Sequence, residues 1–330
     1  MKTRIGLTYD LRSDYLAMGF KEEDVAEFDA DVTIDALENT IRELGHETVR
    51  IGNARALCAQ LAAGARWNLV FNIAEGFGGR SREAQVPCML DVYGIPYTMS
   101  DPLVCAMTLD KAMAKRIVHS AGLKTPGFHV VHKPEDCKNI NLPYPLFAKP
   151  IAEGTGKGID KASKLDTPAQ LQEVCATLLK KHNQPVLVEE YLPGREYTVA
   201  ILGTGSEARV LGTLAFNIRA HAETAIYTFE IKEKCDDFVD YFRPERSPEI
   251  DAVEKLALEA YVALEVRDTG RVDIRLDRND QPSFMEVNPL PGLNPHHSDL
   301  PMIATQAGVS FPNLIKAILD SAFRRQGKSA

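Results

Sequence analysis

Four residues near the C-terminal end are spaced so that they could bind a divalent metal ion. Arg271 and Asp273 are two positions apart in GRVDIRLD, and Glu286 and Asn288 are two apart in MEVNPLPGL. Because side chains two apart on a strand share one face, a hairpin of these segments would bring all four together. Carboxylate and amide oxygens suit Mg²⁺. A charged, solvent-facing hairpin has the same spacing, so both interpretations stay open.

Two lysines and a glycine-rich turn could bind phosphate groups. Lys149 ends the apolar segment YPLFAKP, and Lys111 opens a predicted helix directly after Asp110. The segment IAEGTGKGI after Lys149 can direct backbone N–H groups toward phosphate oxygens. It is not a P-loop, because Ile151 replaces the first glycine of that motif and Gly158 its Ser or Thr. A flexible hairpin turn is the alternative interpretation.

The segment VLVEEYLPG could contact a purine base. Glu189, Glu190 and Leu192 lie where a predicted strand runs into a Pro-Gly turn. Backbone polar groups that are exposed at such an end can hydrogen-bond a purine edge. Many strand ends look alike, so this segment indicates a nucleotide site only together with the lysines and the hairpin.

The first hundred residues are expected to form a parallel sheet. Segments of strand and helix character alternate there, at 3–9, 32–44, 47–51, 54–63 and 67–73. This rhythm is typical of parallel strands with helices on the faces of the sheet. The loop EGFGGRS at 75–81 then leads into a helix near 82–93. Because ligands meet the loops beyond the carboxyl ends of such strands, this loop is a candidate wall of a site.

The rest of the sequence predicts two further blocks of mixed helix and strand. Segments of helical spacing lie at 110–121, 167–181, 249–264 and 311–323, with one more near 300. Segments of strand character lie at 145–150, 186–191, 195–202, 209–215, 271–276 and 283–288. The polar stretch 219–247 has little periodicity, and loops of that length are usually lids or binding loops. We expect domains at 1–103, 104–197 and 198–330.

Composition and charge exclude several classes of protein. The 330 residues are 45% hydrophobic and 25% charged, as in an ordinary globular protein. No apolar run reaches the length of a membrane helix and the start lacks a secretory signal, so we expect a cytoplasmic protein without a membrane partner. With 46 acidic and 38 basic residues and no basic block, a nucleic-acid partner is disfavoured. The six cysteines contain no CxxC pair, and we expect them to be reduced.

The order of these motifs matches a known family. From about residue 76 to 311 the sequence contains, in order, IPYTMSDPLVCAMTLDK, FAKPIAEGTGKGI, VLVEEYLPGREYTVAIL, IYTFEIKEK, GRVDIRLD, MEVNPLPGL and SDLPMIA. Their order and spacing resemble the ATP-grasp superfamily and, within it, the D-alanine–D-alanine ligase family. The resemblance implies an α/β and α+β protein, in which an ATP-grasp fold follows an N-terminal parallel-sheet domain.

The resemblance also implies an activity and a set of site residues. Such ligases phosphorylate a carboxylate with ATP and Mg²⁺ (two ions, replaceable by Mn²⁺), an amine then attacks the acyl phosphate, and the substrates are amino acids. Family members are commonly homodimers. The implied ATP contacts are Lys111, Lys149, Glu189, Glu190, Leu192, Glu196 and Lys232. The implied metal ligands are Asp273, Glu286 and Asn288, and the implied catalytic groups are Arg271, the Gly292 backbone N–H, Lys232 and Thr155.

The departures from the family fall on the amino-acid pockets. Glu75 stands where the family has histidine, Glu233 replaces a lid tyrosine, and a glycine-rich loop with Ser-Glu-Arg after the first strand is missing. We expect Glu75, Tyr227, Glu233, Ser298 and Asp299 to face the substrates. Asp299 beside Ser298 suggests an acceptor that is not a simple α-amino acid.

The anchor for the first substrate's ammonium group stays open at the level of sequence. Glu75, Glu27 and Asp29 are the candidates, whereas a loop salt bridge or a helix N-cap would give the last two a structural role. The pair His296-His297 has no further ligand at zinc spacing, so we expect it to line the pocket.

Three functions are weighed. Synthesis of D-alanyl-D-alanine and a related amino-acid or peptide ligase with altered pockets, for example in specialised metabolism, are equally favoured. A non-catalytic nucleotide-binding regulator is disfavoured, because a binding protein has no use for groups that stabilise a transition state.

Overall fold

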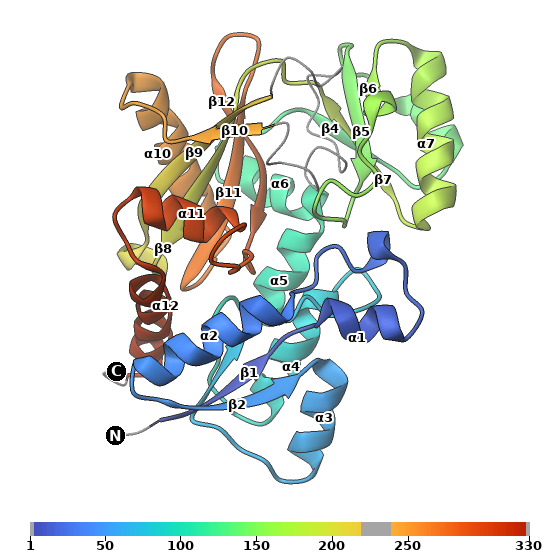
Figure 1. Ribbon diagram of the computed structural model, residues 1–330. Helices are drawn as coiled ribbons and strands as arrows, with labels where there is room; N and C mark the ends of the chain where they lie inside the picture. The colour runs from blue at the N-terminus through green and yellow to red at the C-terminus, as the bar shows by residue number, and fades with distance from the viewer. Residues whose placement is uncertain (1–2, 219–238, 328–330) are drawn as a thin grey trace.

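Three sheets organise the chain in the computed structural model, which describes residues 3–218 and 239–327 (Figure 1). The N-terminal sheet has the order β2-β1-β3 and is parallel, as its alternating pattern predicted. Its strands are β1 (Arg4–Thr8), β2 (Glu47–Gly52) and β3 (Leu69–Asn72). The helices of this region are α1 (Arg12–Ala17), α2 (Asp31–Glu43), α3 (Ala54–Ala62) and α4 (Gln85–Val92), with short 3₁₀ turns η1 (Glu22–Asp24) and η2 (Arg82–Ala84).

The amphipathic helix α2 connects the N-terminal sheet with the end of the chain. Ile34, Leu37 and Ile41 recur at helical spacing and are buried in one core with strand β1 and with Leu314 and Ile318 of helix α12 (Phe311–Arg325). This shared apolar core fixes the N-terminal region against the C-terminal helices. Figure 1 shows the two helices next to each other beside the sheet.

The central sheet is antiparallel and has the order β4-β7-β5-β6. Its strands are β4 (Phe128–Val131), β5 (Leu146–Pro150), β6 (Lys164–Leu165) and β7 (Val186–Glu190). Helix α7 (Pro168–His182) packs on it through Leu171, Cys175 and Leu178. Helices α5 (Pro102–Leu109) and α6 (Lys111–Ser120) precede this sheet in the sequence. The 3₁₀ turns η3 (Pro134–Asn139) and η4 (Lys161–Ser163) lie in the connections between its strands.

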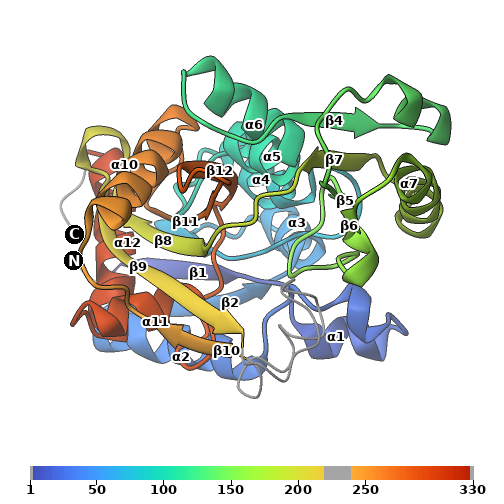
Figure 2. The ribbon, with the colours of Figure 1, turned by 90° about the horizontal axis from the view of Figure 1, so that it is seen from above.

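The C-terminal sheet is antiparallel and has the order β10-β9-β8-β11-β12. Its strands are β8 (Glu196–Leu202), β9 (Arg209–Ile218), β10 (Val239–Phe242), β11 (Thr269–Leu276) and β12 (Pro282–Asn288). Helices α10 (Pro248–Ala263) and α11 (Asp299–Gln306) accompany it, with the 3₁₀ turn η5 (Gly205–Glu207). Seen from above, the central sheet lies on one side and the C-terminal sheet on the other (Figure 2).

Some elements differ from the sequence-based expectation. The polar stretch 219–247 was expected to be loop throughout, but its residues 239–242 form strand β10, which pairs antiparallel with β9. A four-residue edge strand in polar surroundings is too short for its alternation to stand out. The expected domain boundaries fall inside α5 and β8, and the division into three domains remains a proposal.

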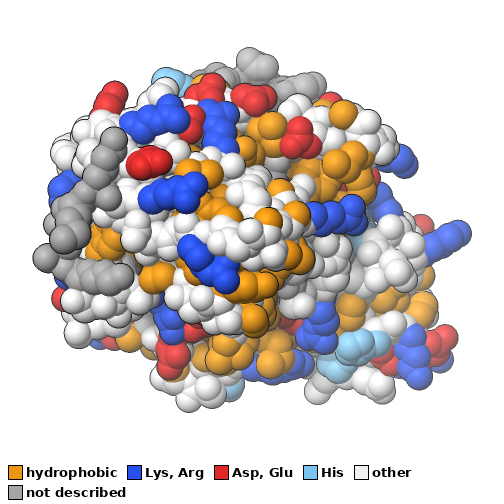
Figure 3. All heavy atoms as spheres, turned by 90° about the horizontal axis from the view of Figure 1, so that it is seen from below, with side chains coloured by type: hydrophobic (Ala, Val, Ile, Leu, Met, Phe, Trp, Pro, Cys, Tyr) orange, Lys and Arg blue, Asp and Glu red, His pale blue; other side chains and the backbone are white. Residues whose placement is uncertain are grey.

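Three further observations concern the surface, the cysteines and the apolar character of the helices. The molecule seen from below, from the side of the N-terminal region, carries apolar side chains among charged ones (Figure 3). The described cysteines are all free thiols. No helix in the described ranges combines the length and the apolar character that crossing a membrane requires.

Candidate active site

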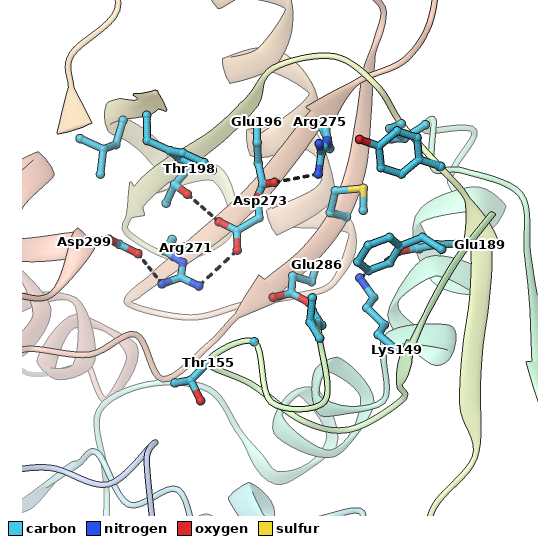
Figure 4. A pocket seen from close by; sticks show the side chains of 18 of the residues that line it. Lys149, Thr155, Glu189, Glu196, Thr198, Arg271, Asp273, Arg275, Glu286 and Asp299 are labelled. Carbon is cyan, nitrogen blue, oxygen red and sulfur yellow. Dashed lines mark hydrogen bonds and ion pairs between the residues drawn. The ribbon is translucent and has the colours of Figure 1, made fainter. Parts of the chain in front are cut away.

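The hairpin of β11 and β12 brings the four predicted residues together. Arg271 is opposite Asn288, and Asp273 is opposite Glu286. Asp273 is 8% exposed, and its two carboxylate oxygens accept hydrogen bonds from Thr198 Oγ1 at 2.9 Å and from Arg271 Nη2 at 3.2 Å (Figure 4). Burial raises the pKa of Asp273, and the neighbouring Glu286 carboxylate raises it further. Two opposed carboxylates and an amide oxygen are a donor set that suits Mg²⁺.

The two lysines predicted to bind phosphate lie in the same region. Lys149, near the end of β5, is buried and lies 2.9 Å from Glu189 Oε1. Lys111 is the first residue of α6, and its Nζ lies 3.3 Å from Glu286 Oε2 and donates to the Glu153 carbonyl at 2.6 Å. Lys111 therefore connects the glycine-rich turn with the carboxylate hairpin.

A third lysine, Lys115, was missed by the sequence analysis. It is fully buried, and its Nζ lies 2.9 Å from Glu189 Oε2, so the Glu189 carboxylate is held between two ammonium groups. Desolvation lowers the pKa of Lys115 to about 8, and the Glu189 carboxylate opposes that shift. Its position one helical turn after Lys111 was the available signal. Glu189 thus orients two lysines, and its predicted contact with a purine stays a prediction.

A cavity lies between the central and C-terminal sheets. Its lining includes the predicted residues Lys149, Thr155, Glu189, Glu190, Leu192, Glu196, Arg271, Asp273, Glu286 and Asp299. Glu196 lies 3.3 Å from Arg275, whose guanidinium lies over the ring of Tyr191 (Figure 4). Apolar side chains such as Phe147 and Met285 complete one part of the lining, which suits a planar aromatic group.

A second cavity reaches from the hairpin to the N-terminal region. It shares Thr155, Tyr241, Arg271, Glu286 and Asp299 with the first. Further predicted residues in its lining are Glu27, Asp29, Glu75, Lys111, Asn288, Gly292, His297 and Ser298. Every residue predicted to be catalytic, to bind ATP, metal or substrate, and described by the structure therefore lines one of the two cavities, whereas His296, which was expected to line the pocket with His297, is in neither lining. Tyr227, Lys232 and Glu233 lie outside the described residues.

Arg271 stands where the two cavities meet. Its Nη1 donates to Asp299 Oδ2 at 2.6 Å, and its Nη2 lies 3.2 Å from Asp273 Oδ2. Nearby, a Cβ added to Gly292 would lie 2.7 Å from Ser298 Oγ, so the two loop segments approach each other closely there. The arrangement leaves a fixed cation and a backbone N–H beside the carboxylate hairpin.

The two structural alternatives for Glu27 and Asp29 have different outcomes. Glu27 does form a loop salt bridge, because Arg82 Nη2 lies 2.8 Å from its Oε2 while Arg82 Nη1 donates to the Ala152 carbonyl at 2.9 Å. Asp29 does not cap helix α2, whose N-cap residue is Ala30. Burial raises the pKa of Asp29 to about 7.

We expect Glu83→Gln to stabilise the ligand-free protein at pH 8 but not at pH 4. Glu83 is 6% exposed, and burial raises its pKa to about 7, with Arg82 and Lys111 opposing the shift. The folded protein holds this proton more tightly than the unfolded chain. The stabilisation that comes from the protonated Glu83 carboxyl is therefore fully present below the pKa of the unfolded chain, and it is lost as the pH rises through 7. Urea unfolding should show a gain of roughly 2–3 kcal/mol at pH 8.

The matched control is Glu47→Gln on strand β2, where the side chain is exposed. This variant should leave the free energy of unfolding unchanged at both pH values. A gain for Glu83→Gln that is the same at pH 4 and pH 8 would contradict the assigned titration.

Two sequence relatives cover most of this chain. The D-alanine–D-alanine ligase of Bordetella petrii is 35% identical over 268 residues, which are 80% of this chain and 78% of that protein. The uncharacterized protein y4sG of Sinorhizobium fredii is 34% identical over 305 residues, which are 88% of this chain and 87% of that protein.

The fold and the sequence matches identify the class and then the family. The crystal structure of D-alanine–D-alanine ligase from Bacillus anthracis complexed with ATP has a TM-score of 0.74 at 23% identity, covering 98% of this chain and 99% of that one. Three sheets in this arrangement, with the cavity between the last two, define an ATP-grasp fold. A family model described as the D-ala D-ala ligase C-terminus matches residues 117–320. This chain belongs to the D-alanine–D-alanine ligase family of ATP-dependent ligases, which form a C–N bond.

Proposed function

We propose that this ligase joins two amino acids through an acyl phosphate. The γ-phosphoryl group of ATP goes to the carboxylate of one amino acid, and the amine of the second then displaces the phosphate. The observation that supports this most is the pair of opposed carboxylates, Asp273 and Glu286, with Lys111 beside Glu286 and Arg271 beside Asp273. Phosphoryl transfer depends on such positioning and charge neutralisation.

The first cavity is proposed to bind ATP. Lys149 and Lys111 would neutralise phosphate oxygens, and Lys149 keeps its charge because it pairs with the buried Glu189. The base would lie against the apolar lining near Leu192 and the end of β7, and Glu196 would contact the ribose. Lys232, outside the described residues, is proposed to approach the γ-phosphate.

The hairpin is proposed as the metal site. Asp273, Glu286 and Asn288 would hold Mg²⁺, as two ions and with Mn²⁺ as a substitute, which neutralises phosphate charge during transfer. The chain itself prepares these ligands: Thr198 orients Asp273, and the Leu290 backbone N–H donates to Asn288 Oδ1 at 2.9 Å.

Amide formation is assigned to the place where the two cavities meet. An amine that attacks the acyl phosphate produces an oxyanion, and Arg271 together with the Gly292 backbone N–H is proposed to stabilise it. Thr155, which lines both cavities, would supply a hydroxyl near the transferred group.

The second cavity is proposed to hold the amino acids. Glu75, Ser298 and Asp299 would contact them there, with Tyr227 and Glu233 from the segment outside the described residues. The relatives from Bordetella petrii and Bacillus anthracis are D-alanine–D-alanine ligases, so D-alanine is one proposed substrate, and a related amino acid is the alternative. We further propose that the chain acts in the cytoplasm, as a homodimer with the domains given above.

The test is ADP release from ATP and Mg²⁺ with a panel of D- and L-amino acids, singly and in pairs. We expect release that depends on the amino acid, and a product whose mass is that of the two amino acids less one water. Strong stimulation by D-alanine alone would establish D-alanyl-D-alanine synthesis. If no amino acid stimulates release, the proposal is wrong, and a nucleotide-binding regulator takes its place.

A further inference from the structure

Several carboxylates lie where the N-terminal region of the chain lines the second cavity. Four of them line it there, namely Glu27, Asp29, Glu75 and Glu83. They come from the segment before α2, from the loop after β3 and from the turn η2, so the fold brings together three separate parts of the N-terminal region. Glu27 in this part of the lining contacts the turn that follows β5, since a Cβ added to Gly154 would clash with its Oε1.

The lysine and arginine side chains of the same lining already have partners. Arg12 lies 2.6 Å from Glu22, Lys111 lies 3.3 Å from Glu286, and Arg271 is bound between Asp273 and Asp299. The neighbouring Arg82 pairs with Glu27 at 2.8 Å. The nearby lysine and arginine side chains are therefore already in ion pairs. Of the four carboxylates, only Glu27 takes part in one of these pairs.

The other three carboxylates lack partners. No hydrogen bond or ion pair to the side chains of Asp29, Glu75 or Glu83 occurs within residues 3–218 and 239–327. Glu83 is the most telling, because it is 6% exposed and its Oε2 is buried without any hydrogen-bond partner in the described chain. A buried carboxylate without a partner costs free energy, which a bound cation would recover.

The part of the second cavity lined by Glu27, Asp29, Glu75 and Glu83 fits an organic cation better than a metal ion. Within the described ranges, no three His, Cys, Asp or Glu side chains are grouped so that they could hold a metal. Burial and the Glu83 and Glu27 carboxylates raise the pKa of Glu75, which is what a site for a positive charge shows when that charge is absent. An ammonium group with its three donors can reach carboxylates that are too far apart to share a metal ion.

Charge balance then indicates the class of substrate. A zwitterionic amino acid such as alanine brings one ammonium group, and its carboxylate must lie toward the hairpin where phosphate is transferred. The two amino acids of the proposed reaction bring at most two ammonium groups, and the attacking amine must lose its proton, so alanine alone does not balance three unpaired carboxylates in this partly buried cavity. We propose that the second cavity binds a diamino acid, an amino acid with a second amino group on its side chain, and that Asp29, Glu75 and Glu83 bind its ammonium groups. This inference rests on the proposed ligase function and narrows it.

The test compares substrates of matched shape. ADP release is measured with ornithine and norleucine, and with 2,4-diaminobutyrate and norvaline, each in both stereochemical forms. We expect kcat/KM to be at least about tenfold higher for a diamino acid than for its neutral counterpart, as for one charged hydrogen bond. Glu75→Gln and Glu83→Gln should lower kcat/KM for the diamino acid about tenfold more than for its neutral counterpart, mainly through KM.

Controls separate binding from folding. Glu47→Gln, on an exposed part of strand β2, should change neither substrate. Glu83→Gln is expected to be more stable than the original protein at pH 8, so a loss of activity there does not reflect unfolding. Glu83→Asp, which keeps the charge, should recover part of the preference for the diamino acid.

Failure of this inference is distinguishable from failure of the proposed function. If neutral amino acids release ADP as well as diamino acids do, or if the Gln variants lower both equally, the inference is wrong and the ligase function stands. If no amino acid releases ADP, calorimetry with 1,4-diaminobutane and butylamine decides. Binding of the diamine alone, lost in Glu83→Gln, supports the cation site, and no binding overturns it.

Discussion

Asp273→Asn is expected to lower ATP turnover by at least about 10²-fold while the protein stays folded. Asn keeps an oxygen that can accept the hydrogen bond from Thr198, so the packing of the hairpin is preserved. The substitution removes the negative charge of Asp273, which lies opposite the Glu286 carboxylate across β11 and β12. Glu286→Gln should act in the same way. ADP release measures the effect, and circular dichroism checks the fold.

The matched control for this variant is Asp280→Asn in the turn of the same hairpin. Asp280 is exposed and has a φ of 55°, a conformation that asparagine tolerates. The same chemical change at this position should leave turnover unchanged. If Asp273→Asn turned over ATP at the original rate, the metal assignment would be rejected.

Arg271→Lys is expected to slow amide formation about 10²–10³-fold and ADP release much less, so that ADP exceeds amide product. The guanidinium reaches Asp273 and Asp299 with two separate nitrogens, which a single ammonium cannot do. An acyl phosphate that forms but is not consumed by the amine is lost to water. Parallel measurement of ADP and amide in one reaction gives the ratio.

Arg278→Lys, exposed in the turn after β11, is the control and should keep ADP and amide equal. Equal losses of ADP release and amide formation in Arg271→Lys would argue against an oxyanion role. Such a result would assign Arg271 to holding the two carboxylates in place.

Much of the fold could be predicted from the sequence, because the patterns that indicate it lie within short segments. Parallel order followed from the alternation of strands and helices, and the gathering of Arg271, Asp273, Glu286 and Asn288 on one hairpin followed from a side-chain period of two. Helix α5 was missed because its sequence PLVCAMTL is almost wholly apolar and therefore shows no helical period.

The parts of the site that were missed depend on contacts between distant segments. Thr198 meets Asp273 because β8 and β11 are neighbours in the sheet, and no spacing in the sequence encodes that neighbour. Glu83 enters the second cavity only when the loop after β3 folds against the segment before α2. Lys115 was nearer to being found, since it shares a helical face with Lys111.

The buried group of Lys115, Glu189 and Lys149 limits how this protein can change over evolutionary time. Replacing Glu189 alone by a neutral residue would leave two ammonium groups facing each other in the interior, and replacing either lysine alone would leave the carboxylate with half of its compensation. Stepwise substitution therefore passes through unstable intermediates. These three positions are inherited or redesigned as one unit, and a library that varies them independently would consist mostly of unfolded proteins.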